Sequence, residues 1–225
     1  VATMIGTASQ PLFGVLGDHG HRRRLILLGT AMTFPAMLLG LVSIHLAELG
    51  SLLAYGLIFT IMLSVRVGQG MYHPPAAGLA GGLMPRNRSM SVALFVSCGA
   101  IGFALGQPMF GAVWKWDWAQ RHTEIILIPA AVLLLLIARW CRPTEAASAG
   151  RASLAERLGE LRLIGRPLTL LFVVQSMVAV LNFSIFFLLP EFCQQRSYPA
   201  WLQDGGAFML MVLGSAALMI PIGRL

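Results

Sequence analysis

The chain has 225 residues, of which 57% are hydrophobic and only 11% charged, and its formal net charge is +7. A water-soluble domain carries about a quarter charged residues, so this composition excludes an ordinary soluble globular domain. The basic residues stand in short segments between apolar runs, which is typical of membrane proteins and argues against a nucleic-acid partner.

The hydrophobic residues gather in seven runs that we interpret as membrane-spanning helices, because a span needs about 20 apolar residues. The runs cover residues 1–16, 25–44, 52–82, 89–114, 123–141, 167–190 and 206–225. In the run 52–82, glycines and two adjacent prolines crowd the second half, which predicts a kinked or tilted helix. The sequence therefore predicts an all-α polytopic membrane protein. Both ends of the chain fall within apolar runs, so we expect an internal piece of a longer protein, in which the run 1–16 is a truncated span.

Charge in the loops predicts the orientation of these helices. One set of alternate loops carries eleven arginines, namely Arg22, Arg23, Arg24, Arg86, Arg88, Arg139, Arg142, Arg151, Arg157, Arg162 and Arg166. The other set carries only Lys115, Arg121 and Arg196. Basic residues concentrate in cytoplasmic loops, so we expect the first set to face the cytoplasm.

The one sizeable polar stretch, residues 142–166, predicts the domain organisation. Within it, Ser153 and Glu156 have the spacing of a capping box, which predicts a short amphipathic helix on the membrane surface. We interpret residues 1–141 as an N-terminal bundle, 142–166 as a cytoplasmic linker and 167–225 as the start of a second bundle.

Two polar side chains lie deep within an apolar run, where a charge is costly and usually has a partner or a function. Arg66 and His73 are seven residues apart, so a helix places them on one face. Gly70 lies between them and would let another helix or a substrate approach closely. We interpret this face as a polar stripe along a central cavity, and histidine suits a proton relay there. The alternatives are that Arg66 is a structural cation and that His73, with Pro74, only caps or kinks the helix.

The run 89–114 contains Gly102 and Gly106, a small-xxx-small pair that permits close helix packing, followed by Pro108. This pair predicts either tight packing alone or a pliable hinge that seals the protein against ion leak. The sequence has no P-loop, and its three cysteines have no metal-ligand spacing. We therefore expect no enzymatic activity, no metal and no cofactor.

Three short motifs occur in order along the chain. Gly14, Leu16, Asp18, Arg22 and Arg23 match the loop pattern G-x-L-a-D-r-x-G-r-k, in which His19 and His21 take positions usual for Arg and Gly. Arg66, Gln69 and Gly70 match R-x-x-q-G, and Gly102 and Gly106 match part of g-x-x-x-G-P-x-x-G, where Gln107 replaces the proline. With this order and spacing, the chain resembles the major facilitator superfamily of secondary transporters. The stretch from Tyr72 to Pro74 is similar to the fosmidomycin-resistance type of efflux protein.

The resemblance implies a two-bundle fold, of which this chain would cover the second to the eighth span. It also implies roles for the motif residues. Gly14, Asp18, Arg22 and Arg23 would form an inner gate loop that helps hold the outward-facing state. Arg66, Gln69, Gly70 and His73 would serve proton coupling or line the cavity. Gly102, Gly106 and Pro108 would form a packing or hinge element that favours efflux.

The function implied is secondary active transport, namely proton-coupled efflux of a small organic compound or drug by alternating access. The expected partners are the lipid bilayer, the small-molecule substrate and protons, with no nucleic acid. We expect a monomeric, multi-pass protein of a bacterial inner membrane. Two alternatives stay open: a proton symporter that imports a metabolite, and a transport-inactive membrane sensor or scaffold.

Overall fold

A computed structural model of the chain describes residues 2–39, 50–140 and 165–222. Within these ranges the regular elements are all helices or short helical turns, which confirms the predicted all-α class. In chain order they are α1 (Ala2–Leu16), the turn η1 (Gly17–His21), α2 (Arg22–Ala31), η2 (Phe34–Leu38), α4 (Ser51–Leu83), η3 (Pro85–Asn87), α5 (Arg88–Trp114), α6 (Asp117–Arg121), η4 (Thr123–Ile126), α7 (Leu127–Trp140), α9 (Gly165–Gln195), η5 (Leu202–Gly206) and α10 (Ala207–Ile222).

Contacts divide the chain into two compact units. The first unit comprises Val1–Val92 and Val113–Ala149, and the second comprises Ala93–Ala112 and Gly150–Leu225. The middle of α5 therefore groups with the later helices. The predicted linker 142–166, with its amphipathic helix, lies outside the described residues except for its last two, which begin α9. The division into bundles on either side of that linker stays a prediction.

Among the described residues, five helical segments are long and apolar enough to cross a membrane. They are Leu52–Leu83, Pro85–Trp114, Thr123–Trp140, Thr169–Gln195 and Leu202–Met219. These segments correspond to the last five predicted runs. Since a bilayer has no water to satisfy exposed backbone groups, helices of this length and composition are what the apolar runs require.

The first two predicted runs form shorter helices. The first contains α1, with 15 residues, and the second begins with α2, with only 10. The predicted span 25–44 is interrupted in its described part, because α2 ends at Ala31 and the turn η2 follows with Pro35 at its start. Proline has no N–H to donate to the carbonyl four residues earlier, here that of Ala31, and its ring clashes with that carbonyl.

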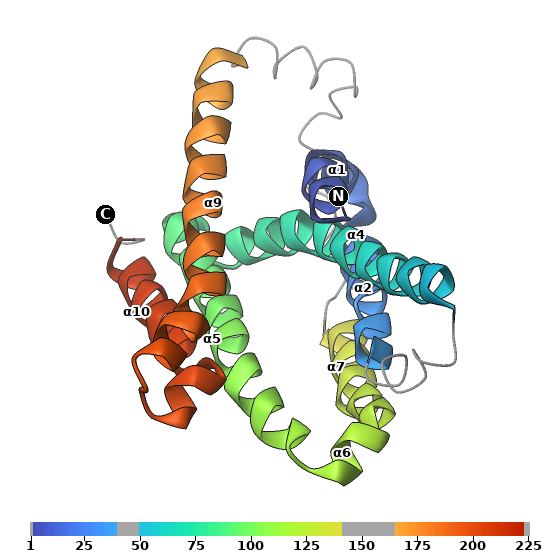
Figure 1. The fold of residues 1–225 in the computed structure, drawn as a ribbon. Coiled ribbons are helices and arrows are strands. Elements are labelled where there is room, and N and C mark those ends of the chain that lie inside the picture. Colours follow the sequence, from blue (N-terminus) through green and yellow to red (C-terminus); the bar gives the residue numbers. More distant parts are fainter. Residues whose placement is uncertain (1, 40–49, 141–164, 223–225) are drawn as a thin grey trace. The chain divides into compact units, whose positions relative to one another are not determined.

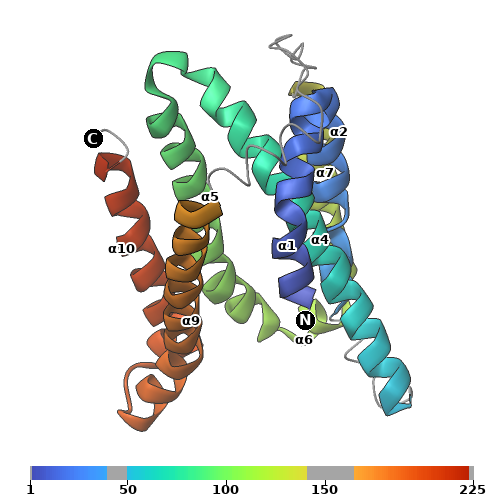
Figure 2. The same ribbon diagram turned by 90° about the horizontal axis from the view of Figure 1, so that it is seen from above.

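Helix α4 is the central element of the first unit, with α1 and α2 packed along it (Figures 1 and 2). A Cβ atom added at Gly70 would lie 2.6 Å from the carbonyl oxygen of Gly6 in α1. A Cβ atom added at Gly68 would lie 2.6 Å from the carbonyl oxygen of Gly29 in α2. Two residues that are two positions apart on a helix point in directions about 200° apart. Gly70 therefore leaves room for α1 on one side of α4, and Gly68 leaves room for α2 on the other. The backbones of α1 and α2 thus touch opposite sides of α4.

The second half of α4 stays helical through its two prolines. Cβ atoms added at Gly14, near the end of α1, and at Gly17, the first residue of η1, would lie 3.5 Å from Pro74 and 3.3 Å from Pro75, respectively. Pro75 is almost fully buried. The proline rings therefore form part of the surface against which the end of α1 packs, and the predicted kink of this helix stays a prediction.

The second unit is held by contacts among α5, α9 and α10. The ring of Phe208 in α10 meets Phe103 of α5 and Phe186 of α9 edge to face, at centroid distances of 5.2 and 4.8 Å. Such edge-to-face pairs are favourable because the edge and the face of an aromatic ring carry opposite partial charges. Ser97 of α5, which is buried, donates a hydrogen bond of 3.4 Å to the carbonyl oxygen of Ala216 in α10.

We predict that Gly68→Ala and Gly70→Ala each lower the unfolding free energy of the full-length protein by about 1–3 kcal/mol, the usual cost of overpacking a tight core. The added methyl group would meet backbone, which cannot move aside as a flexible side chain would. Gly56→Ala is the matched control on the same helix, because no atom lies within 4 Å of a Cβ there. Unfolding measured in detergent should show the loss for the first two variants, and an equal loss for Gly56→Ala would contradict the crossing described here.

Candidate functional site

The turn η1 joins α1 to α2, and at one position its backbone has a conformation that favours glycine. Gly20 has φ +93° and ψ 3°, in the left-handed region where a side chain is strained. Just before it, a ring nitrogen of His19 lies 2.8 Å from the carbonyl oxygen of Val15 and satisfies one of the last carbonyl groups of α1. The sharp reversal at Gly20 starts α2 at Arg22 and thereby places the basic residues 22–24 in the first turn of a helix.

An ion pair closes this turn. Arg22 donates from Nη2 to Oδ1 of Asp18 at 2.8 Å, and both side chains are more than a third exposed. An exposed pair of this kind contributes only about 0–1 kcal/mol. The guanidinium carbon of Arg22 also lies 3.5 Å from the Cβ position of Gly78 on α4, where the absence of a side chain leaves room for it. The pair therefore matters more for where it holds Arg22 than for stability.

The neighbouring arginine connects α2 to α7. Arg23 donates from Nη2 to the carbonyl oxygen of Ala138 at 2.8 Å. Ala138 lies in the last turn of α7, where carbonyl groups have no partner within the helix and the helix dipole is negative. A cation there is favourable. The structure thus brings the predicted gate residues together with the ends of α4 and α7, at one end of the first unit.

Arg66 lies half-buried near the middle of α4. Its Nη1 donates to Oε1 of Gln69 at 3.0 Å, so the first and fourth residues of the R-x-x-q-G motif are bonded to each other. Its Nε is buried and has no hydrogen-bond partner among the described residues. A buried donor without an acceptor costs free energy, so the guanidinium of Arg66 has unused capacity to bind an acceptor.

The predicted stripe along α4 is only partly assembled. Gly70 contacts the backbone of Gly6 and the hydroxyl group of Ser9, so the close approach predicted there is made by α1 rather than by a cavity. His73 is exposed, and within the described chain its ring meets that of Tyr72 at 5.5 Å. The structure shows no contact between His73 and Arg66. It therefore brings Arg66, Gln69 and Gly70 together and leaves His73 apart from them.

The glycine pair of α5 has a different environment. No atom lies within 4 Å of a Cβ built at Gly102 or Gly106, so the predicted close helix packing is not present among the described residues. Instead both glycines line an open hollow of about 600 Å³ within the second unit, together with Phe103, Phe110, Gly111, Pro190, Gln203, Asp204 and Gly205. Pro108, which is partly buried, follows on the same helix, and a hinge or seal role for this segment stays a prediction.

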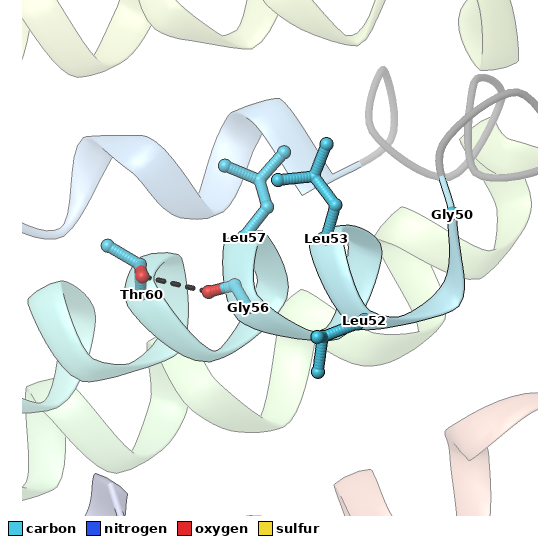
Figure 3. Close-up of a pocket in the computed structure, with 6 residues that line it drawn as sticks. All are labelled: Gly50, Leu52, Leu53, Gly56, Leu57 and Thr60. Atoms are coloured by element: carbon cyan, nitrogen blue, oxygen red, sulfur yellow. Dashed lines mark hydrogen bonds between the residues drawn. The ribbon is translucent and has the colours of Figure 1, made fainter.

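A second hollow lies on the first half of α4 (Figure 3). Its lining consists of Gly50, Leu52, Leu53, Gly56, Leu57 and Thr60. The hydroxyl group of Thr60 donates to the carbonyl oxygen of Gly56 at 2.8 Å, so the one polar side chain is already satisfied. An exposed apolar surface supplied by a single helix offers no polar group to orient a substrate, and we do not regard it as the candidate site.

Sequence reasoning missed the partners of the motif residues. Gly6 and Gly29 were not singled out, although small residues in neighbouring apolar runs are a weak signal of close helix crossings. The carbonyl group of Ala138, which accepts from Arg23, leaves no signal in the sequence because every residue has such a group.

Comparison with known proteins identifies the family. No curated protein and no solved structure matches the chain. A family model described as the Major Facilitator Superfamily matches residues 1–225, which is the whole chain. The members of this family are transporters rather than enzymes, and apolar helices of spanning length fit a multi-pass membrane protein. The chain therefore belongs to the Major Facilitator Superfamily of secondary transporters.

Proposed function

We propose that the full-length protein exports a small organic compound in exchange for protons, by alternating access between two bundles. Family membership supports secondary transport in general. The observation that carries the finer proposal is the environment of Arg66, a cation near mid-helix whose Nε has no acceptor among the described residues.

Arg66 is the 16th of the 33 residues of α4, and such a helix is long enough to cross a bilayer. A guanidinium group at that depth calls for a counter-charge. In the proposed mechanism, a carboxylate or an anionic group of the substrate approaches Arg66 in one state, and protonation of a carboxylate releases it. Because a ligand shifts a conformational equilibrium only through its different affinities for the two states, this exchange lets protons bias the direction in which the protein faces.

The Gly17–His21 turn supports the second half of the proposal. Directly after the turn, at the start of α2, Arg22 contacts α4 at Gly78 and Arg23 contacts α7 at Ala138, so this corner of the chain connects α2 to both helices. A connection of this kind can hold one facing state and must rearrange when the helices move. We assign Gly14, Asp18, Arg22 and Arg23 to the inner gate on these grounds.

The direction of transport is proposed from two features. The motif at Gly102 and Gly106 resembles that of exporters, and its exposed glycine face leaves room for another helix to pack there. The stretch from Tyr72 to Pro74 resembles the fosmidomycin-resistance type of exporter, and we propose that subgroup. We further propose bundles on either side of the linker 142–166, with the substrate near the midplane between them, in a bacterial inner membrane.

The full-length protein in proteoliposomes tests the function directly. We expect that an imposed pH gradient, acidic on the side that receives the compound, drives movement of a substrate found by a counterflow screen of drugs and metabolites. Substrate movement in the same direction as protons would favour the importing symporter. The absence of counterflow for every compound, in a folded protein, would favour the sensor or scaffold.

For the coupling residue, we predict that Arg66→Ala abolishes proton-driven transport, because a carboxylate would lose its partner, while membrane insertion and folding are retained. The measurement is transport in proteoliposomes with and without a pH gradient. Arg121→Ala is the control, since Arg121 is exposed at the end of the short helix α6. Wild-type rates in the Arg66→Ala protein would overturn the assignment.

For the gate, we predict that Asp18→Asn slows the transport cycle by up to about fivefold, which is the effect of losing an exposed ion pair of about 1 kcal/mol. Substrate affinity should change much less, because Asp18 lies in the turn and not near Arg66 in the sequence. Substrate binding and counterflow rate, measured on the same preparation, separate the two effects. Equal losses in both would indicate that Asp18 is only structural.

A further inference from the structure

Six arginines lie at one end of the first unit, which we call the arginine rim. They are Arg22, Arg23 and Arg24 at the start of α2, Arg86 and Arg88 at the junction of η3 and α5, and Arg139 near the end of α7. Five of the six are exposed, and Arg22 is partly buried. Three segments that are far apart in the sequence thus supply one charged surface.

Contacts within the unit show that these segments meet. The guanidinium carbon of Arg22 lies 3.5 Å from the Cβ position of Gly78, and Nε of Arg88 lies 3.9 Å from that of Gly81, three residues further along α4. Residues three apart lie on the same side of a helix, so two guanidinium groups from different segments flank one glycine edge. The start of α5 is fixed there by Ser91, whose hydroxyl group donates to the carbonyl oxygen of Ala80 at 2.5 Å. The bond from Arg23 to Ala138 brings in α7.

The charge at this end is poorly balanced. Among the described residues of the first unit the acids are Asp18, Asp117 and Glu124, and only Asp18 lies at the rim, where it pairs with Arg22. Within the described part of the chain, no acidic side chain pairs with the other five arginines. The remaining two acids lie in α6 and η4, before α7 begins, beside Lys115 and Arg121. Among the described residues, the numbers of basic and acidic residues are therefore equal there, whereas basic residues greatly outnumber acidic ones at the rim.

Two helix ends add to the positive potential. Both α2 and α5 begin at the rim, neither has an acidic residue in its first turn, and the N-cap residues His21 and Asn87 make no side-chain capping hydrogen bond. The dipole of a helix is positive at its start, so arginines at that position are disfavoured unless an anion lies nearby. The arrangement is the opposite of the usual one, in which acids occupy the first turn.

We infer that the arginine rim binds the phosphate groups of anionic phospholipids, with Arg86 and Arg88 contributing through guanidinium groups that no acid among the described residues pairs. Guanidinium groups match phosphate oxygens in a two-pronged geometry. Arg86, Arg88 and Arg139 lie at the ends of the segments Pro85–Trp114 and Thr123–Trp140, which are long enough to span a bilayer, so the lipid headgroups lie at the level of these ends. A cluster of exposed basic residues at that level fits an anionic leaflet, which favours lipid over a soluble anion as the occupant.

The experiment compares lipids on the full-length protein in detergent. Phosphatidylglycerol, phosphatidylcholine and inorganic phosphate are each titrated, and binding is followed by native mass spectrometry and by the unfolding temperature. We expect phosphatidylglycerol to bind the wild-type protein and raise its unfolding temperature, and phosphatidylcholine and inorganic phosphate to do so far less. The affinity for phosphatidylglycerol should fall about fivefold for each arginine removed in the double variant Arg86→Gln/Arg88→Gln.

The double variant Arg121→Gln/Arg196→Gln removes the same charge elsewhere. Its affinity for phosphatidylglycerol should differ from that of the wild-type protein by no more than about twofold, which is less than the loss expected for a single rim arginine. An equal loss in both double variants would show that net charge, and not the rim, binds the lipid. Equal protection by inorganic phosphate would overturn the assignment to lipid. Neither result depends on transport, so this inference and the proposed function fail separately.

Discussion

The packing of α1 and α2 against α4 depends on two glycines that leave no room for a Cβ atom. Gly70 touches the backbone of Gly6, and Gly68 touches that of Gly29, on nearly opposite sides of one helix. In a bilayer, where apolar surface gains little by leaving lipid for protein, close van der Waals packing of this kind replaces the hydrophobic effect as the force between helices. The rest of the first unit is arranged around this three-helix contact.

The contact also decides where the charged groups lie. With α1 held at Gly70, its end reaches Pro74 and Pro75, and the turn that follows delivers Arg22 to the glycine edge of α4. With α2 held at Gly68, Arg23 reaches the end of α7. Arg66, two residues before the first of these glycines, is enclosed as a result, and its Nε loses access to water. Packing, gate and buried cation are therefore consequences of the same crossing.

The separation of charge along the unit has a physical basis as well. Arginines gather at one end and a balanced set of charges at the other, while the helices between them are apolar. A bilayer enforces such a pattern, since charges move to the interfaces and the hydrocarbon core keeps only those with a partner or a function. Among the described residues, the six arginines of the rim exceed what Asp18, the one acid beside them, can neutralise, which gives this end of the first unit a surface suited to anionic groups.

Much of the fold could be predicted from the sequence. The apolar runs predicted the all-α class and seven spans, five of which correspond to helical segments of spanning length among the described residues, because hydropathy over about 20 residues reports directly on the surrounding lipid. Loop arginines predicted which segments share one side, and the contacts of Arg22 and Arg23 with α4 and α7 agree with that grouping. The interruption after Ala31 was missed, although Pro35 carries the reason for it in the sequence.

Composition and the lengths of the apolar runs alone thus determined that the chain is helical and membrane-spanning, and loop charge predicted one basic side. Tertiary structure alone decided which glycines are contacts. Gly68 and Gly70 are enclosed by neighbouring backbones, whereas Gly102 and Gly106, with an equally suggestive spacing, line an open hollow. Only the three-dimensional arrangement showed that Gln69 and a backbone carbonyl group are partners of Arg66 and Arg23. The reason is that a glycine or a carbonyl group has the same chemistry everywhere in a sequence, and only its neighbours in space give it a role.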